Sequence, residues 1–348
     1  MISPHPWGIH RSLEPPGVLP QLALRLDATP DALDNEIAVA VESLAIDSAS
    51  FRQMRESEAA GAGSVSDQIR SIVSRRGKMQ NPVTGSGGIF LGRVRQVGPG
   101  HPDRGTLAPG ERIASLVSLT LTPLHLERII AVHPKAERVD VEGTAILFAR
   151  TLYGRLPADL PEEVALAAFD VAGAPASVRA RAEIGQTVLV IGTGKAGLLC
   201  LAAAREAVGP RGRVLALDPS EEATERARRL GFADEVWTVD ARDSPAVHGA
   251  VEAHTAGRLA DLVVNVANAP GTETASVLCA RDAGTVLFFG MATSFSAAAL
   301  GAEGLAHPAT LLIGNGYVPG HAEMALDLLR RHPGLLAAFA PLASPRSS

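Results

Sequence analysis

The pattern of apolar and polar positions changes character near the middle of the chain. Residues 36–45 and 89–97 alternate apolar and polar side chains with a period of two, which predicts half-buried strands. Residues 112–119 follow a Pro-Gly turn and predict a further strand. Between these strands, residues 64–78 have the composition of a polar helix, and residues 80–88 (QNPVTGSGG) predict a loop. The first half of the chain is therefore predicted to be mainly β.

From about residue 161 the pattern predicts strands and helices in alternation. Residues 162–174 are helical by composition. The predicted strands cover residues 187–191, 213–217, 235–238, 262–266 and 285–289, and the helices between them begin near Lys195, Glu221 and Thr272. Such alternation indicates a parallel sheet with right-handed crossovers. Residues 285–289 are expected to be the last strand of that sheet, with an exposed edge suited to assembly. An amphipathic helix is expected over residues 321–331.

The first strand-to-helix junction of the second half carries a dinucleotide-binding fingerprint. Residues 188–197 read VLVIGTGKAG, with three glycines in G-x-G-x-x-G spacing between an apolar strand and an apolar helix. The first glycine permits the tight turn, the second lets the backbone approach a pyrophosphate, and the third lets helix and strand pack closely. The helix N-terminus then faces the phosphates. The predicted contact residues are Gly192, Thr193, Gly194, Lys195, Ala196 and Gly197.

The next predicted strand ends in an acidic residue that indicates which dinucleotide binds. Asp218 lies about 20 residues beyond the last glycine, where a carboxylate accepts hydrogen bonds from the adenosine ribose. Glu221 and Glu222 follow it and would repel a 2′-phosphate, so NAD is favoured over NADP. The carboxyl ends of two later strands should also line the crevice. They add Val266, Asn268, Met291 and Thr293 to the predicted cofactor-binding residues.

Composition narrows the classes of protein to which the chain belongs. A length of 348 residues with 46% hydrophobic and 20% charged residues suits a globular protein of two domains. The net charge is −5 and both signs are scattered, so nucleic acid is not an expected partner. No apolar run is long enough for a membrane span, and the first residues do not resemble a secretory signal. With only two cysteines, a reducing, cytoplasmic location is expected.

The motifs that the sequence lacks limit its chemistry further. No cluster of His, Cys or Glu has metal-ligand spacing, and neither a nucleophile elbow nor a Walker loop occurs. Two cysteines cannot supply a four-thiolate zinc site. Hydride transfer to or from a nicotinamide is the chemistry that remains, since the cofactor itself carries it.

A β-rich first half, a Rossmann unit and a short helical tail together resemble the medium-chain dehydrogenase/reductase superfamily. The resemblance implies an α/β fold with a GroES-like catalytic domain over residues 1–170. A Rossmann cofactor domain with a doubly wound parallel sheet would cover 171–316, and a C-terminal helical segment over 317–348 would return to the catalytic domain. Zinc-dependent members carry a Cys and a Gly-His-Glu at positions where this chain has residues 46–48 (IDS) and 85–87 (GSG). The resemblance therefore implies a zinc-free member.

Five phrases of the sequence carry a narrower resemblance. They are residues 47–51 (DSASF), 78–88 (KMQNPVTGSGG), 170–176 (DVAGAPA), 291–295 (MATSF) and 314–317 (GNGY). These phrases are similar to the family of L-erythro-3,5-diaminohexanoate dehydrogenases, and the long loop is the most specific of them. The resemblance implies NAD-dependent oxidative deamination of the diamino acid to 5-amino-3-oxohexanoate and ammonia in lysine fermentation. It also implies a homo-oligomer, and we expect a dimer.

This reaction requires a general base, an acid to hold the remaining ammonium, and donors for the carboxylate. Asp47 occupies a metal-ligand position of the zinc-dependent relatives and is the first choice for an amine partner; capping the following turn is the alternative. Lys78 is a candidate to hold the carboxylate, with a solvated surface lysine as the alternative. Ser86 and Thr84 are candidate hydrogen-bond donors in the same loop, or they serve only the turn.

Further candidates lie in the second half. Glu303, in an apolar and glycine-flanked stretch, is a candidate base if it is desolvated, and an exposed loop residue otherwise. His321 is a candidate proton shuttle, with helix capping as the alternative. Asp170 is expected to cap the start of a helix, while His10 and Arg11 are expected in a surface turn. Two rival functions stay open: a zinc-free quinone or enoyl reductase that uses NADPH, and a non-catalytic NAD-binding scaffold.

Overall fold

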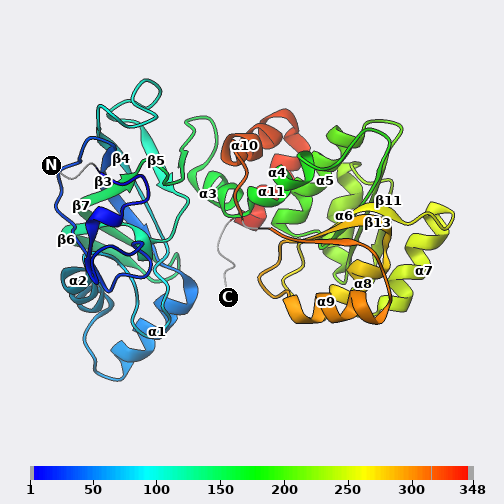
Figure 1. Ribbon diagram of the computed structural model, residues 1–348, viewed down its shortest axis with the longest axis horizontal. Coiled ribbons are helices and arrows are strands. Elements are labelled where there is room, and N and C mark those ends of the chain that lie inside the picture. Colours follow the sequence, from blue (N-terminus) through cyan, green and yellow to red (C-terminus); the bar gives the residue numbers. More distant parts are fainter. Residues whose placement is uncertain (1–3, 315, 344–348) are drawn as a thin grey trace. The chain divides into compact units, whose positions relative to one another are not determined.

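The computed structural model describes residues 4–314 and 316–343, and the chain forms two compact units, residues 1–157 and 158–348 (Figure 1). The boundary predicted from the sequence, at residue 170, differs from this division. In the structure, residues 158–170 and the helices of the C-terminal segment belong to the second compact unit. Asn315, within one of the phrases singled out above, lies outside the described residues.

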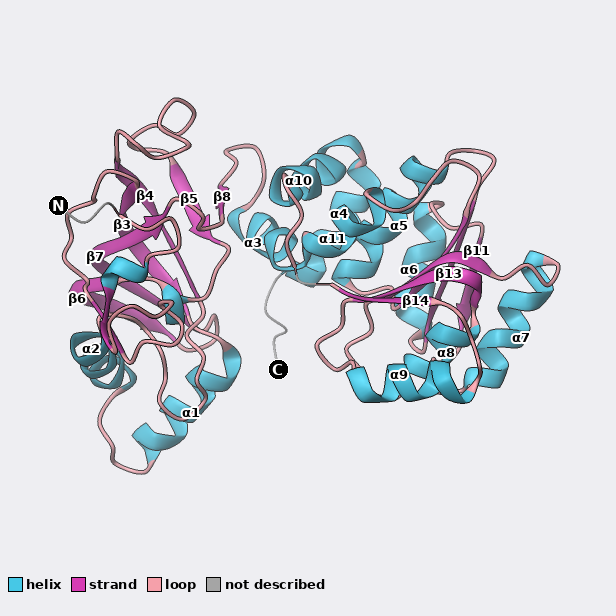
Figure 2. Ribbon diagram, in the orientation of Figure 1, coloured by secondary structure: helices cyan, strands magenta, loops and turns pink. Residues whose placement is uncertain are grey.

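The first unit is built on an antiparallel six-stranded sheet with the strand order β6-β7-β3-β4-β5-β8 (Figure 2). Its strands are β3 (Glu36–Ala45), β4 (Ile89–Val97), β5 (Arg112–Ser115), β6 (Leu124–His133), β7 (Arg138–Phe148) and β8 (Tyr153–Arg155). A small separate sheet pairs β1 (Ser12–Glu14) with β2 (Arg25–Leu26). The strands predicted over residues 36–45 and 89–97 are thus confirmed, and they pair with each other.

Two helices and two short 3₁₀ turns complete the described part of the first unit. Helix α1 (Ser48–Ala59) starts where the Asp47 carboxylate accepts the Ser50 N–H, and α2 (Val65–Arg76) starts where the Ser64 hydroxyl accepts the Asp67 N–H. Gly77 ends α2 in the left-handed conformation that favours glycine. The 3₁₀ turns are η1 (Ile9–Arg11) and η2 (Leu119–Leu121).

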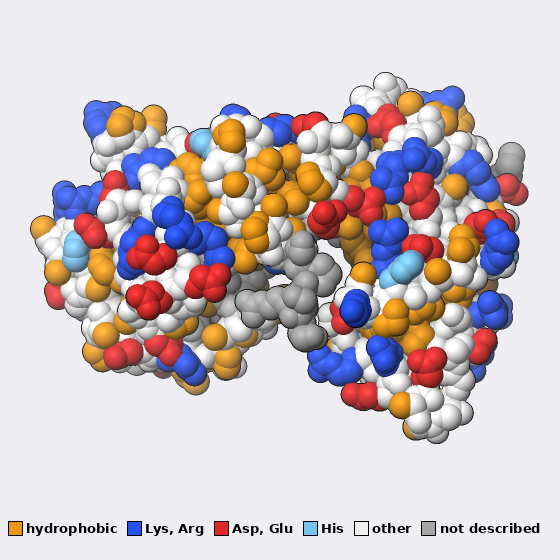
Figure 3. Space-filling model, turned by 180° about the vertical axis from the view of Figure 1, so that it is seen from behind, with side chains coloured by type: hydrophobic (Ala, Val, Ile, Leu, Met, Phe, Trp, Pro, Cys, Tyr) orange, Lys and Arg blue, Asp and Glu red, His pale blue; other side chains and the backbone are white. Residues whose placement is uncertain are grey.

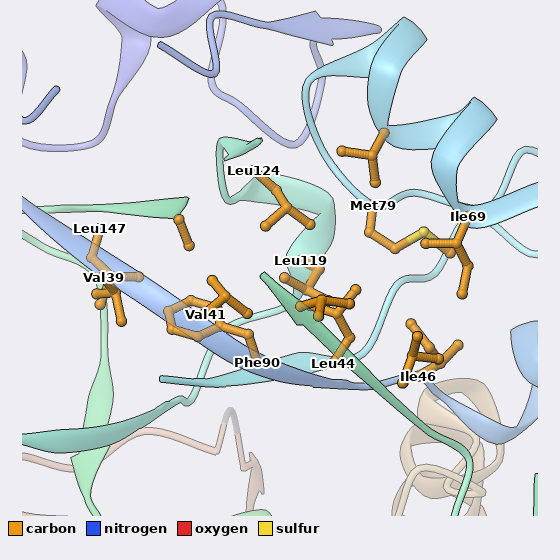
Figure 4. Close-up of a cluster of buried hydrophobic side chains, with 14 of the residues drawn as sticks. Val39, Val41, Leu44, Ile46, Ile69, Met79, Phe90, Leu119, Leu124 and Leu147 are labelled. Atoms are coloured by element: carbon orange, nitrogen blue, oxygen red, sulfur yellow. The ribbon is translucent and has the colours of Figure 1, made fainter. Parts of the chain in front are cut away.

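A hydrophobic cluster in the first unit fixes the glycine-rich loop that follows α2. Figure 4 shows side chains of β3 and β4, among them Val41 and Phe90, facing Ile69 of α2 together with Met79 and Leu119. Met79 is fully buried at the start of the loop, and the Leu119 N–H donates to the carbonyl of Gly88 at its end. The core therefore holds both ends of the loop in place.

Contrary to the expectation of a surface turn, Arg11 is buried in a polar network. Its guanidinium donates to both carboxylate oxygens of Glu36 at 3.0 and 2.6 Å, and the His10 Nε2 lies 2.8 Å from one of them. Further donors and acceptors come from the backbone, for example the Leu33 N–H. Buried charges persist only when they are paired and hydrogen-bonded, and the first strand of the main sheet supplies the partner that the local sequence does not reveal.

The second unit contains a wholly parallel sheet with the order β11-β10-β9-β12-β13-β14. Its strands are β9 (Thr187–Ile191), β10 (Arg213–Asp218), β11 (Glu235–Thr238), β12 (Ala260–Asn265), β13 (Ala280–Phe288) and β14 (Thr310–Ile313). The order reverses between β9 and β12, which makes this junction the switch point at which α/β proteins bind ligands. The predicted parallel, doubly wound arrangement is confirmed.

Helices cover both faces of this sheet, with α5 and α6 on one face and α7, α8 and α9 on the other (Figure 2). The described helices of the second unit are α3 (Glu162–Val171), α4 (Gly173–Arg179), α5 (Lys195–Val208), α6 (Glu221–Leu230), α7 (Ser244–Thr255), α8 (Glu273–Leu278), α9 (Phe295–Gly304), α10 (His321–Arg331) and α11 (Pro333–Ala343). The expectation that β13 forms the edge is wrong, because the short strand β14 pairs beside it and is the last strand of the sheet among the described residues.

Charges of both signs are interspersed among apolar side chains on the face shown in Figure 3. That face carries no broad field of one sign that would attract a polyanion. In the part of the chain that the structure describes, no helix has the length and apolar character needed to cross a bilayer.

Candidate functional site

The glycine-rich turn connects β9 to α5 with the geometry that the sequence predicts. Gly192 has φ +97°, a conformation that favours glycine, and its N–H donates to the Leu217 carbonyl of the neighbouring strand. A Cβ on Gly197 would lie 2.0 Å from the carbonyl oxygen of Gly192. These two glycines therefore serve the turn and the close contact between the helix and the turn.

A cleft of about 570 Å³ opens beside this turn at the carboxyl ends of β9, β10, β12 and β13. Its lining includes nine of the eleven predicted cofactor-binding residues: Gly192, Gly194, Lys195, Ala196, Gly197, Asp218, Val266, Asn268 and Met291. The other two, Thr193 and Thr293, are not part of the lining. Thr193 is fully buried. The cleft thus lies at the switch point of the sheet.

Asp218 binds the turn as well as lining the cleft. One carboxylate oxygen accepts the backbone N–H of Thr193 at 2.7 Å, and the other accepts that of Ser220 at 2.9 Å. Each oxygen has lone pairs left for a further donor. The side chain therefore stabilises the shape of the loop and is available to a ribose hydroxyl at the same time.

Two details of the turn fit a bound dinucleotide. A Cβ on Gly194 would meet no atom within 4 Å, so the space in front of this backbone is open. Gly194 is also the N-cap of α5 and has no side chain with which to cap the helix, so the first N–H groups of the helix are available to an anion. Behind them, the buried Thr193 hydroxyl has no partner among the described residues. The turn accordingly has space and donors for a pyrophosphate.

The far side of the cleft is fixed by polar contacts that the sequence analysis missed. Buried Asn265 donates to the hydroxyls of Thr272 and Ser276 at 2.8 and 2.9 Å and accepts the Ala267 N–H. Buried Glu273 accepts the Ser294 N–H at 2.7 Å and so ties the loop that follows β13 to α8. Acidic and amide residues beside a strand end are the only signal that could have indicated this network.

Met291 is the most exposed apolar side chain of the cleft. Its relative exposure is 95%, although it follows a buried strand. Gly290 beside it packs so closely on Ala267 that a Cβ would lie 2.2 Å from the Ala267 carbonyl oxygen. The loops after β12 and β13 therefore contact each other, and Met291 beside this contact exposes its apolar side chain at the cleft.

In the first unit, three predicted residues lie around one loop. The Asp47 carboxylate caps α1, and its second oxygen is buried without a partner among the described residues. The Ser50 and Thr84 hydroxyls are 2.5 Å apart, and the Thr84 hydroxyl accepts the Ser86 N–H at 3.3 Å. A Cβ on Gly88 would lie 2.9 Å from the Asp47 nitrogen, so the loop packs directly on this residue. Asp47 therefore caps α1 with one carboxylate oxygen, while its second oxygen has no partner among the described residues.

Lys78 does not lie on the surface or face an anion. Its side chain is fully buried, and the ammonium donates to the Pro20 carbonyl at 2.8 Å. Burial, together with nearby Arg76, lowers the pKa of Lys78 to about 8. The predicted role as carboxylate holder is not supported by this placement, because no surface of the ammonium is open to a ligand.

Glu303 and His321 do not line the cofactor cleft. Glu303 is exposed at the end of α9, so the desolvation on which its proposed role depends is absent. His321 is the first residue of α10 and is buried against the ring of Tyr317, with ring centroids 5.6 Å apart. Burial lowers the pKa of His321. The structure does not bring these two residues together with the glycine turn.

Asp170 corrects another expectation. It lies in the last turn of α3 rather than at a helix start, so it is not an N-cap. Its carboxylate lines the cofactor cleft, which the sequence analysis did not predict. Across residues 4–314 and 316–343, no group of three or more His, Cys, Asp or Glu side chains has the arrangement of a metal site.

Comparisons with known proteins agree with the division of the chain into two units. Residues 10–157 match the family described as "L-erythro-3,5-diaminohexanoate dehydrogenase N-terminal domain", and residues 196–315 match the family described as "zinc-binding dehydrogenase". L-erythro-3,5-diaminohexanoate dehydrogenase of Acetoanaerobium sticklandii is 43% identical over 93% of this chain and 94% of its own length. The chain belongs to the L-erythro-3,5-diaminohexanoate dehydrogenase family. A second member, from Fusobacterium nucleatum, is 42% identical over 96% of this chain and 97% of its own length.

This member of the L-erythro-3,5-diaminohexanoate dehydrogenase family is an oxidoreductase dependent on a nicotinamide dinucleotide, and the quinone reductase alternative is not favoured. The fold also resembles that of alcohol dehydrogenase TADH from Thermus sp. ATN1, with a TM-score of 0.52, 20% identity, and coverage of 91% of this chain and 87% of that one. The resemblance to the medium-chain superfamily inferred from the sequence is confirmed.

Proposed function

We propose that this protein oxidises L-erythro-3,5-diaminohexanoate with NAD and water, giving 5-amino-3-oxohexanoate, ammonia and NADH in lysine fermentation. The observation that carries the proposal is the identity of 43% and 42% to two enzymes of that name over nearly the whole chain. In this reaction the C3–H bond supplies the hydride, the resulting iminium takes up water, and the C–N bond then breaks to release ammonia.

The glycine turn supports the binding half of this proposal. The open space at Gly194 and the N–H groups at the start of α5 would hold the pyrophosphate, and Asp218 would hold the adenosine ribose. The bound dinucleotide supplies the hydride acceptor. Met291 and Val266 would pack against its ring from the carboxyl ends of the strands. The role of the protein here is to orient the ring and to exclude water from it.

In the first unit, we assign Asp47 to the amine chemistry of the same reaction. Its second carboxylate oxygen is buried without a partner among the described residues, and the loop containing Thr84 and Ser86 packs against the Asp47 backbone through Gly88. A carboxylate with an unused oxygen accepts a proton or a hydrogen bond from an amine, whereas a helix cap alone would not need that oxygen. Ser86 would donate its hydroxyl hydrogen bond beside it.

NAD rather than NADP is our proposal for the acceptor. The Asp218 carboxylate at the end of β10 would repel a 2′-phosphate, and Glu221 and Glu222 follow at the start of α6. Steady-state assays with both dinucleotides test this directly. Asp218→Ala should raise the relative use of NADP and weaken the turn, because it removes the acceptors of the Thr193 and Ser220 N–H groups. Asp218→Asn should change the preference and weaken the turn less, because the amide oxygen still accepts one of these two N–H groups. An unchanged preference in both variants would contradict the assignment.

We also propose that the enzyme works without zinc, as a homodimer, in the cytoplasm. Residues 46–48 and 85–87 offer neither a thiolate nor an imidazole at the positions where zinc-dependent relatives bind metal. For the dimer, the free side of β14 carries Ile313 at 67% exposure, an arrangement suited to pairing with a second copy. Activity that persists after exhaustive chelation would support the zinc-free proposal.

The decisive experiment follows the absorbance of NADH with the purified enzyme and racemic 3,5-diaminohexanoate. Turnover with NAD, together with release of one ammonia per NADH, is the expected result. Binding of NAD without turnover of the diamine would instead support a non-catalytic scaffold. Turnover of a quinone with NADPH, and none of the diamine, would identify a reductase.

A further inference from the structure

One carboxylate of the cofactor cleft has no role in the binding of the dinucleotide described above. Asp170 lies in the last turn of α3, and its side chain reaches the cleft that is lined by Lys195 and Met291. The side chain is 71% exposed. It faces the same cavity as the glycine turn, although it comes from a helix that precedes the whole parallel sheet.

The local helix structure does not account for this acid. Asp170 lies where the C-terminal turn of α3 is followed directly by α4, with Ala172 in the right-handed helical conformation between them, so the opposite ends of two helix dipoles meet there and favour neither sign of charge. Asp170 caps no helix, since α4 begins at Gly173 with Ala172 as its N-cap.

Within the described chain, the carboxylate has little internal compensation. Its nearest cation is the Lys195 ammonium at 4.0 Å, which is beyond hydrogen-bonding distance. Both side chains are solvated, with exposures of 36% for Lys195 and 71% for Asp170. Such exposed ion pairs stabilise a fold only weakly. The oxygens of Asp170 are therefore open to a cation that enters the cleft.

We propose that Asp170 binds the non-reacting 5-ammonium of the diamino acid. This assignment rests on the proposed function. A substrate that keeps a positive charge through the reaction needs a fixed negative partner as it enters a cavity with an apolar surface such as Met291. Asp170 is an acid of this cleft whose oxygens are not engaged by backbone N–H groups, in contrast to Asp218.

The test compares two substrates and three variants. The substrates are 3,5-diaminohexanoate and 3-aminohexanoate, which lacks the ammonium in question. The variants are Asp170→Asn, Asp170→Glu and the matched control Glu163→Gln, which removes a carboxylate from an exposed position on the same helix. Fluorescence titration of NADH measures cofactor binding, and a second titration measures binding of each amino acid to the enzyme–NADH complex.

Asp170→Asn should lower kcat/KM for the diamine by about 10- to 100-fold, the range for loss of a hydrogen bond to a charged group. Most of this loss should lie in KM, and the dissociation constant of the diamine from the NADH complex should rise in parallel. With 3-aminohexanoate, the variant and the wild type should agree within about twofold. NADH binding should be unchanged, Asp170→Glu should recover part of the loss, and Glu163→Gln should behave as wild type.

Equal losses on both substrates would overturn the assignment, because Asp170 would then act on the reacting amine or on the fold. Full activity of Asp170→Asn on the diamine would overturn it as well. If the wild-type enzyme did not oxidise the diamine at all, the proposed function would itself fail and this assignment with it. The wild-type assay thus separates failure of the function from failure of the residue.

Discussion

Two glycines of one turn should respond in opposite ways to the same added methyl group. At Gly194 a Cβ would enter open space, and its φ of −72° is accessible to alanine. At Gly197 a Cβ would lie 2.0 Å from the Gly192 carbonyl oxygen and 2.8 Å from its carbon. Gly194→Ala should therefore preserve the fold and fill the space meant for the pyrophosphate, while Gly197→Ala should damage the fold itself.

The structure indicates the size of each effect. Backbone atoms surround the clash at Gly197, so α5 or the turn must move by about an ångström, and overpacking of this kind costs about 1–3 kcal/mol. In a unit of this size, such a loss lowers Tm by roughly 2–4 °C for each kcal/mol. Gly194→Ala should leave the free energy of unfolding within about 0.5 kcal/mol, and it even restricts the unfolded chain slightly.

Thermal unfolding and NAD titration, measured on both variants and on the wild type, separate the two effects. Gly194→Ala should weaken NAD binding at least about tenfold, equivalent to about 1.4 kcal/mol, with little change in Tm. Gly197→Ala should lower Tm and binding together. If Gly194→Ala bound NAD as tightly as the wild type, the cofactor would not approach this backbone and the account of the cleft would be wrong.

Three further predictions concern stability and assembly. Burial tends to raise the pKa of Glu36, but hydrogen bonds from His10 and Arg11 outweigh burial and hold the pKa below its usual value. The contribution of Glu36 to stability should therefore be lost as pH falls below about 4.5. Glu36→Gln should lower the free energy of unfolding by about 3–5 kcal/mol in urea at pH 7, and a loss below about 1 kcal/mol would contradict the pairing. Lys78 has a folded-state pKa of about 8 against 10.5, so the unfolded chain binds more protons between these values and stability should rise with pH across that window, by up to about 3 kcal/mol. Lys78→Met should abolish the rise, and an identical pH profile in the two proteins would refute the argument. Ile313→Lys should shift a dimer to monomer in sedimentation analysis, with Leu300→Lys on α9 as the exposed control, and an unchanged mass would exclude pairing through β14.

Elements with a strong local pattern were predictable from the sequence. The strands at residues 36–45, 89–97 and 187–191 begin and end as their alternation or apolar run indicates, and α10 covers residues 321–331 as its amphipathic pattern predicts. The glycine turn was predictable for the same reason, because conformation and spacing are encoded within ten residues. Nine of the eleven predicted cofactor-binding residues accordingly line the cleft.

What the sequence concealed depends on contacts distant along the chain. Strand β14 is short and helix α1 is polar, and neither has clear periodicity. Pairing with β13 stabilises β14, while α1 is stabilised by its Asp47 cap and by burial of Phe51 and Met54. Arg11 has the appearance of a surface residue until Glu36, 25 positions away, is placed beside it. Lys78 lies in the most distinctive loop of the sequence, yet its ammonium points inward to Pro20, 58 positions away. Side-chain direction in a loop is set by packing, which a residue type does not encode.

The double use of Asp218 limits how cofactor choice can change. The same carboxylate that would discriminate between dinucleotides also holds the Thr193 N–H and hence the shape of the turn. A lineage, or a protein engineer, that moves this enzyme from one dinucleotide to the other cannot simply delete the acid, because the loop would lose its anchor in the same step. The accessible path runs through asparagine, which retains one of the two acceptors while removing the charge, and only afterwards through a new cation nearby.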